Sequence, residues 1–99
     1  MGEYPTAKEL RTLRAWNLSQ GSIMEFLDYI RAIWWAPDWG YTLSGKRVLR
    51  LALHTGGWSG NEEIIEALQR NYLFWPLCWR KETVGGHYWF RIDTKEFRR

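Results

Sequence analysis

The chain has 99 residues, of which 45% are hydrophobic and 25% are charged, and its formal net charge is +3. These values predict one globular domain spanning residues 1–99 with a single core, and they exclude a disordered or strongly polybasic chain. The single cysteine, Cys78, excludes an intramolecular disulfide and favours a reducing cytoplasm. No apolar run reaches about 18 residues, so we expect a soluble, cytoplasmic protein with no membrane partner.

Two helices are predicted in the first 45 residues, after a loose end at residues 1–4. Thr6 and Ser22 each precede a glutamate by three positions, which is the spacing of a capping box at a helix start. The first helix is predicted from about Ala7 to Trp16. The second begins at Ile23, carries a core-facing apolar stripe, and ends before Pro37.

A strand, a bend and a third helix are predicted next. Residues 46–54 alternate between leucine and other residues, which is typical of a strand with one buried face. A bend containing Gly56 and Gly57 follows. The third helix is predicted over about residues 60–71, with Ser59 as its cap in a third capping box.

Residues 74–82 and 87–93 are predicted to form a hairpin around the turn Val84-Gly85-Gly86, with a loose tail at residues 94–99. The predicted register places the following residues opposite each other: Glu82 and His87, Lys81 and Tyr88, Arg80 and Trp89, Trp79 and Phe90, Cys78 and Arg91, and Leu77 and Ile92. The pairs with Phe90 and Ile92 then lie on an apolar, core-facing side. The pairs with Trp89 and Arg91 lie on a cationic, aromatic side.

The expected fold class is α+β. Two N-terminal helices precede a β-α-β-β unit with a small three-stranded sheet. If the strands on either side of the third helix are parallel, that helix crosses over with right-handed sense and covers the leucine face.

The glycine-rich bend has a structural and two chemical interpretations. It resembles a phosphate cradle, but it lacks the Walker and dinucleotide spacings, and Glu62 and Glu63 would repel phosphate from the helix start. Ser59 and His54 could act as nucleophile and base, but Asn61 stands where a nucleophile elbow needs glycine. We therefore interpret the bend as a tight turn and predict no catalytic residue.

The histidines His54 and His87 and the thiol Cys78 are the only soft metal ligands. None of them has the spacing of a zinc finger. The sequence therefore predicts no metal site and no cofactor.

The eight tryptophans exceed what a chain of this size easily buries, so some are expected at a contact surface. Arg50, Arg80, Trp89 and Arg91 are expected on the outer side of the sheet. Three alternatives remain open: the first two helices cover this side, it binds a protein, or it binds nucleic acid. The remaining candidates for partner contact are Trp35 and Trp39 near the Pro37 loop and Trp58 in the bend.

About half of the chain resembles a known family. The residues that carry the resemblance are the run His54-Thr-Gly-Gly-Trp-Ser-Gly-Asn-Glu-Glu-Ile-Ile-Glu-Ala-Leu68, then Phe74-Trp75, Cys78-Trp79 and Gly85-Gly86-His87-Tyr88-Trp89-Phe90. They resemble a family of small phage and prophage proteins of unassigned function. The resemblance implies no activity or catalytic residue; it implies an accessory factor that binds host machinery or counters host defence.

We therefore expect a non-enzymatic, phage-encoded binding protein that inhibits or redirects a host or host-defence protein, in the manner of an anti-CRISPR. The alternative is a nucleic-acid-binding protein that uses the basic sheet face with Arg98 and Arg99. An enzyme centred on His54 is the weakest of the three interpretations.

Overall fold

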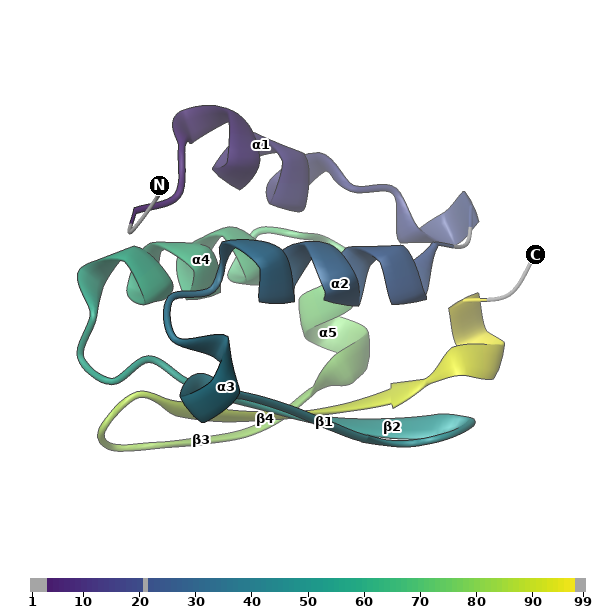
Figure 1. Ribbon diagram of the computed structural model, residues 1–99. Helices are drawn as coiled ribbons and strands as arrows, with labels where there is room; N and C mark the ends of the chain where they lie inside the picture. Colours follow the sequence, from purple (N-terminus) through teal and green to yellow (C-terminus); the bar gives the residue numbers. More distant parts are fainter. Residues whose placement is uncertain (1–3, 21, 98–99) are drawn as a thin grey trace.

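The computed structural model describes residues 4–20 and 22–97 and has an α+β fold. Its elements, in chain order, are α1 (Ala7–Ala15), η1 (Leu18–Gln20), α2 (Ile23–Ile33), α3 (Pro37–Gly40), β1 (Tyr41–Gly45), β2 (Val48–His54), α4 (Ser59–Gln69), α5 (Phe74–Cys78), β3 (Trp79–Thr83), β4 (His87–Asp93) and η2 (Thr94–Phe97). Figure 1 shows three layers, with α1 above α2 and α4, and these two helices above the sheet.

The sheet has four strands in the order β1-β2-β4-β3, and each strand is antiparallel to its neighbours. The expected α+β class is confirmed, but the three-stranded sheet is wrong, because residues 41–45 add β1 at one edge. Gly45 permits the tight return to β2 because its φ is +100°, in the left-handed region. The strands β2 and β3 run in the same direction with β4 between them, so the helical connection spans a split pair.

The core lies between the sheet and the helices. Leu49, Leu51 and Leu53 of β2 are buried there, as their alternation predicted. Tyr41 links the sheet to α2, because its hydroxyl donates a hydrogen bond of 3.0 Å to the Leu27 carbonyl. One connected apolar cluster thus positions the sheet under its helices.

Only one of the three predicted capping boxes is confirmed. The Thr6 hydroxyl accepts from the Glu9 amide at 3.0 Å, and the Glu9 carboxylate accepts from the Thr6 amide at 2.9 Å. Ser22 instead has a left-handed φ of 70° and makes no side-chain cap. At the third site Trp58 occupies the cap position and Ser59 is already the first helical residue, so the predicted Ser59 cap is wrong.

The predicted hairpin turns at residues 84–86 as expected, but its first strand is wrong at the far end. Residues 74–78 form α5 rather than strand, so Cys78 is buried in a helix and does not lie opposite Arg91. Pro76 is tolerated in the first turn of α5, where a missing amide proton removes no helical hydrogen bond. The amides of Leu73 and Phe74 donate to the Asn71 side-chain oxygen at 3.2 and 3.0 Å, which satisfies the start of this helix.

A β-bulge at Arg80 changes the register of β3 against β4. Trp79 lies opposite Phe90, as predicted. Beyond the bulge, the predicted pairs of Glu82 with His87 and of Lys81 with Tyr88 are wrong by one residue. The observed pairs are Lys81 with Trp89, Glu82 with Tyr88 and Thr83 with His87. The extra residue moves the Lys81 side chain from the core side to the outer side of the sheet.

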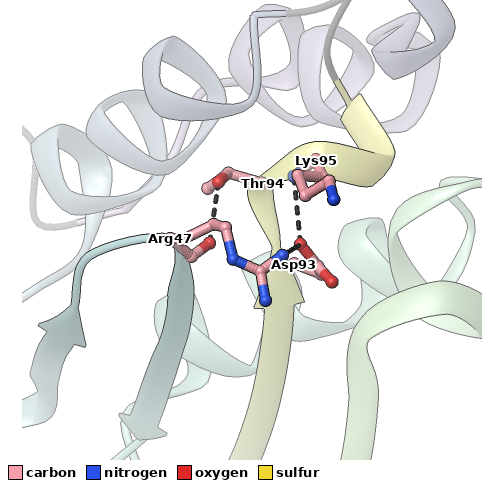
Figure 2. A network of polar contacts seen from close by, with 4 residues as sticks. All are labelled: Arg47, Asp93, Thr94 and Lys95. Carbon is pink, nitrogen blue, oxygen red and sulfur yellow. Dashed lines mark hydrogen bonds and ion pairs between the residues drawn. The ribbon is translucent and has the colours of Figure 1, made fainter.

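The expected loose end is corrected for residues 94–97, which form η2 and bury Phe97; residues 98–99 lie outside the described part. Figure 2 shows the contacts that hold this segment against the β1–β2 turn. The Arg47 guanidinium lies 3.0 Å from the Asp93 carboxylate, and the amide and hydroxyl of Thr94 donate to the Arg47 carbonyl at 3.0 and 2.7 Å. The amide of Lys95 also donates to Asp93, at 3.1 Å.

Asn71 is the buried polar link between the first helix and the C-terminal half. Its amide donates to the carbonyls of Leu13 and Trp16 at 2.8 and 3.1 Å, in addition to capping α5. We predict that Asn71→Ala lowers the free energy of unfolding by about 3 kcal/mol, because the orphaned buried groups lose their partners. Urea denaturation measures this. Asn17→Ala, at an exposed position, serves as the matched control and should cost less than about 1 kcal/mol.

Candidate binding surface on the outer sheet face

The strands β2 and β4 present every second residue pair on the side of the sheet that faces away from the core. We call this side the outer sheet face. Its central pairs are His54 with His87, Ala52 with Trp89, and Arg50 with Arg91. Figure 1 shows α1 and α2 on the opposite side of the sheet, with only the short α3 beside the strands, so the alternative in which the first two helices cover Trp89 is wrong. The face is therefore open to a partner.

Arg50 and Arg91 lie directly opposite each other on adjacent strands, and both are exposed. Like charges in this position destabilise a sheet by a few tenths of a kcal/mol up to about 1 kcal/mol. Neither guanidinium forms a hydrogen bond or ion pair with another residue in the described part of the chain. The sheet thus keeps an uncompensated repulsion at its centre.

Lys81 and Arg80 extend the positive charge toward the β3 edge. The Lys81 ammonium lies 4.8 Å from the centre of the Trp89 ring, a cation–π contact. The prediction that Arg80 would lie opposite Trp89 is wrong, because the bulge gives that place to Lys81. The Arg80 guanidinium instead donates to the carbonyls of Leu77 and Trp79 at 3.2 and 2.9 Å, and it still reaches the same surface.

A depression of about 330 Å³ lies on this face, where the small side chain of Ala52 leaves room beside Trp89. Its lining surface is mostly apolar, and the residues that line it include the polar and cationic Thr42, Ser44, Arg50, Arg80 and Arg91. No described carboxylate lines it. The depression therefore offers hydrogen-bond donors and an aromatic ring to an anionic or planar group.

The positive charge of the chain is concentrated on this face. It carries Arg50, Arg80, Lys81 and Arg91, four of the 14 Lys and Arg residues of the chain. Without these four cations the chain has ten Lys and Arg residues against 11 Asp and Glu residues, so the four cations account for the positive sign of the net charge.

His54 and His87 occupy the end of the face next to the glycine bend. Their Nδ1 atoms lie 2.7 Å apart and share a hydrogen bond. Burial, and secondarily the positive charge of a protonated His87, lower the pKa of His54 from its usual 6.5. Trp39 and Trp89 lie edge-on to His54 with ring centres at 6.0 Å. The sequence did not reveal this cluster, because nothing in it showed that β2 pairs with β4.

The glycine bend itself is a structural turn. Gly56 and Gly57 both have left-handed φ values, and a side chain at Gly56 would press on the Trp39 ring. The buried Asn61 holds the bend in place, because its side chain exchanges hydrogen bonds with the Trp35 backbone at 2.9 and 3.1 Å. No hydrogen bond joins Ser59 to His54 in the described structure, so a serine nucleophile with a histidine base has no geometric support.

The other predicted contact residues lie apart from the arginines. Trp58 is stacked between Trp35 and Tyr4, with ring centres at 4.9 and 5.0 Å. Trp35 is 41% exposed, and Trp39, near His54, is 57% exposed. The structure thus brings Arg50, Arg80, Arg91 and Trp89 together, and it places Trp35 and Trp58 in a separate ring stack.

The chain matches no protein-family model, no curated protein and no solved structure. None of the described helices is long and apolar enough to cross a bilayer. Among the residues that the structure describes, no three or more His, Cys, Asp or Glu side chains gather as a metal site.

The lowered pKa of His54 predicts a pH dependence of stability. Below about pH 6.5 the unfolded chain protonates His54 while the folded chain resists this, so the free energy of unfolding falls as the pH drops through 6.5 and levels off below the folded pKa. Urea denaturation between about pH 7.5 and pH 5 measures the effect. His54→Gln should flatten this part of the profile; an unchanged slope in the variant would contradict the assignment.

Proposed function

We propose that this protein is a non-enzymatic binding protein and that its outer sheet face binds single-stranded nucleic acid. The observation that carries the proposal is the opposed pair Arg50–Arg91, which has no carboxylate partner in the described structure and lies beside an aromatic ring. A phosphate group between the two guanidinium groups would replace their repulsion by two charge-assisted contacts. Binding energy is thus available where two like charges lie opposite each other in the unbound sheet.

The neighbouring residues suit the other parts of a nucleotide. Cation-lined grooves with aromatic side chains bind single strands, since the cations follow the phosphates and the rings stack on the bases. Trp89 supplies a ring, and the hydroxyls of Thr42 and Ser44 supply neutral donors and acceptors at the same depression. A net charge of +3 is weak when spread over a whole chain, but here it is concentrated on one face.

A second candidate follows from the exposed tryptophans. Trp35 and Trp39 are 41% and 57% exposed, and tryptophan and arginine are the residues most enriched in protein interaction hot spots. The partner expected from the sequence in this case is a host or host-defence protein. In both candidates the chain acts by binding, and the two differ in which residues carry the affinity.

We predict saturable binding of single-stranded oligonucleotides at low salt, with an affinity that falls steeply as salt is raised. Arg50→Thr and Arg91→Thr should each weaken binding about fivefold and lower the salt slope by about 1, since each removes one phosphate contact. Fluorescence anisotropy measures both quantities. The matched control is Arg11→Ala, on the exposed side of α1, which should change neither.

The same arginine variants test whether the repulsion is real. Threonine suits an exposed strand position, and removing one of two opposed charges should leave the free energy of unfolding unchanged or raise it by up to about 0.5 kcal/mol. A variant that loses stability together with binding would show that the arginines support the fold. Oligonucleotide binding that is absent at low salt would reject this partner.

The protein-partner candidate predicts a stoichiometric complex in a pull-down from lysate of a bacterial host. Trp35→Ala and Trp39→Ala should each weaken that complex by about tenfold or more, because each removes a hot-spot ring. The same two variants should leave oligonucleotide binding unchanged. Tyr72→Ala, which removes an exposed ring next to α5, is the control. Recovery of the same proteins by the wild type and the tryptophan variants would reject this candidate.

A further inference from the structure

The histidine pair at the end of the outer sheet face brings two imidazole rings into close contact. His54 and His87 are direct cross-strand partners on the two central strands, and both are half-buried. The backbone beside them is held by a hydrogen bond of 2.9 Å from the Thr55 amide to the Gly86 carbonyl. A side chain at Gly86 would collide with Thr55, which keeps the two strand ends in close contact.

The spacing of the two rings matches what a metal ion requires. Two imidazole nitrogens at about 2.0 Å from one ion lie about 2.8 Å apart at a square-planar angle and about 3.3 Å apart at a tetrahedral angle. The observed Nδ1–Nδ1 distance of 2.7 Å is close to the square-planar value, and each ring has to turn by about 45° from the shared hydrogen bond to aim its lone pair at one ion. We propose that His54 and His87 together bind a divalent late transition metal ion, with copper(II) preferred.

The protons balance in this step. In the neutral pair one Nδ1 carries the proton of the shared hydrogen bond, and the other Nδ1 accepts it. When the ion bonds to both Nδ1 atoms, the donor ring loses its Nδ1 proton and takes up one at Nε2 through solvent. Two neutral imidazoles therefore bind the ion without net release of protons.

The number of ligands decides which ion is favoured. The described residues offer only these two ligands, since no group of three or more metal-binding side chains is present there. Structural zinc sites use four protein ligands, so a two-histidine site is a poor zinc site. Copper(II) forms the strongest complexes with nitrogen ligands among the common divalent ions and accepts a planar arrangement. Its remaining positions face the open side of the sheet, where water completes them.

Titration of the purified chain with copper(II) chloride tests the proposal. The rings of Trp39 and Trp89 lie 6.0 Å from the His54 ring, so a paramagnetic ion bound there should quench part of the tryptophan fluorescence in a saturable manner, with one ion per chain. Electron paramagnetic resonance should show hyperfine coupling to two imidazole nitrogens. Cys78 is fully buried in α5, so its thiol does not compete.

His54→Gln and His87→Gln should each weaken copper binding by more than about tenfold, since even the loss of an outer-shell partner costs that much at metal sites. Circular dichroism confirms that each variant is folded, and Arg11→Ala, on the exposed side of α1, serves as a control that leaves the outer sheet face unchanged. Saturable binding that persists in the double histidine variant, or uptake of several ions with no defined stoichiometry, would overturn the proposal. The test is independent of nucleic-acid binding, because it uses the metal alone.

Discussion

The antiparallel pairing of β2 with β4 determines where every residue of the candidate surface lies. Leu51 is opposite Phe90 and Leu53 is opposite Tyr88 on the core side of the sheet. Because side chains alternate along a strand, the residues between them must point outward, and a slip of one residue would bring the arginines into the core. The free energy of core packing therefore holds Arg50 opposite Arg91, at a place where electrostatics alone would separate them.

Much of this arrangement was predictable from local patterns. The strand at residues 87–93 was predicted with the observed bounds and the first helix with the observed start at Ala7, since alternation and a capping box are properties of a few neighbouring residues. The pairing of β2 with β4 was not predictable in this way, because it joins residues more than thirty positions apart. The α5 helix was missed for a similar reason: residues 74–78 are aromatic and apolar, and their helical start depends on the distant contacts of Asn71.

In the candidate site, too, local patterns predicted some features, and others depend on contacts between distant parts of the chain. Its arginines and Trp89 were predicted to share a face, and they do: Arg50, Trp89 and Arg91 alternate with core residues of their own strands, and Arg80 reaches the face from the bulge. Lys81 was assigned to the wrong face, since a β-bulge at Arg80 leaves no local mark in the sequence. The glycine bend turns through left-handed Gly56 and Gly57 as its composition predicted, but Trp58 takes the cap position expected for Ser59, and the side chain of Asn61 bonds the backbone of Trp35 across the fold. Local motifs compete with such tertiary contacts and lose when the latter are buried.

The two proposed activities share one row of residues and are therefore linked. Along β4 the outward positions are His87, Trp89 and Arg91, so the histidine pair and the arginine pair are four residues apart, about 13 Å at the usual rise of a strand. At physiological ionic strength charges separated by more than about 8 Å are largely screened, so an ion on the histidines does little to the arginines directly. A polyanion that spans the row contacts both the bound ion and the arginine pair, and each of the two positive charges raises its affinity. Since linkage is reciprocal, such a strand must raise the affinity for the ion by the same factor by which the ion raises the affinity for the strand. A ligand confined to the Arg50–Arg91 pair lacks this coupling, which makes the length of the bound strand the quantity that decides whether the two sites act as one surface.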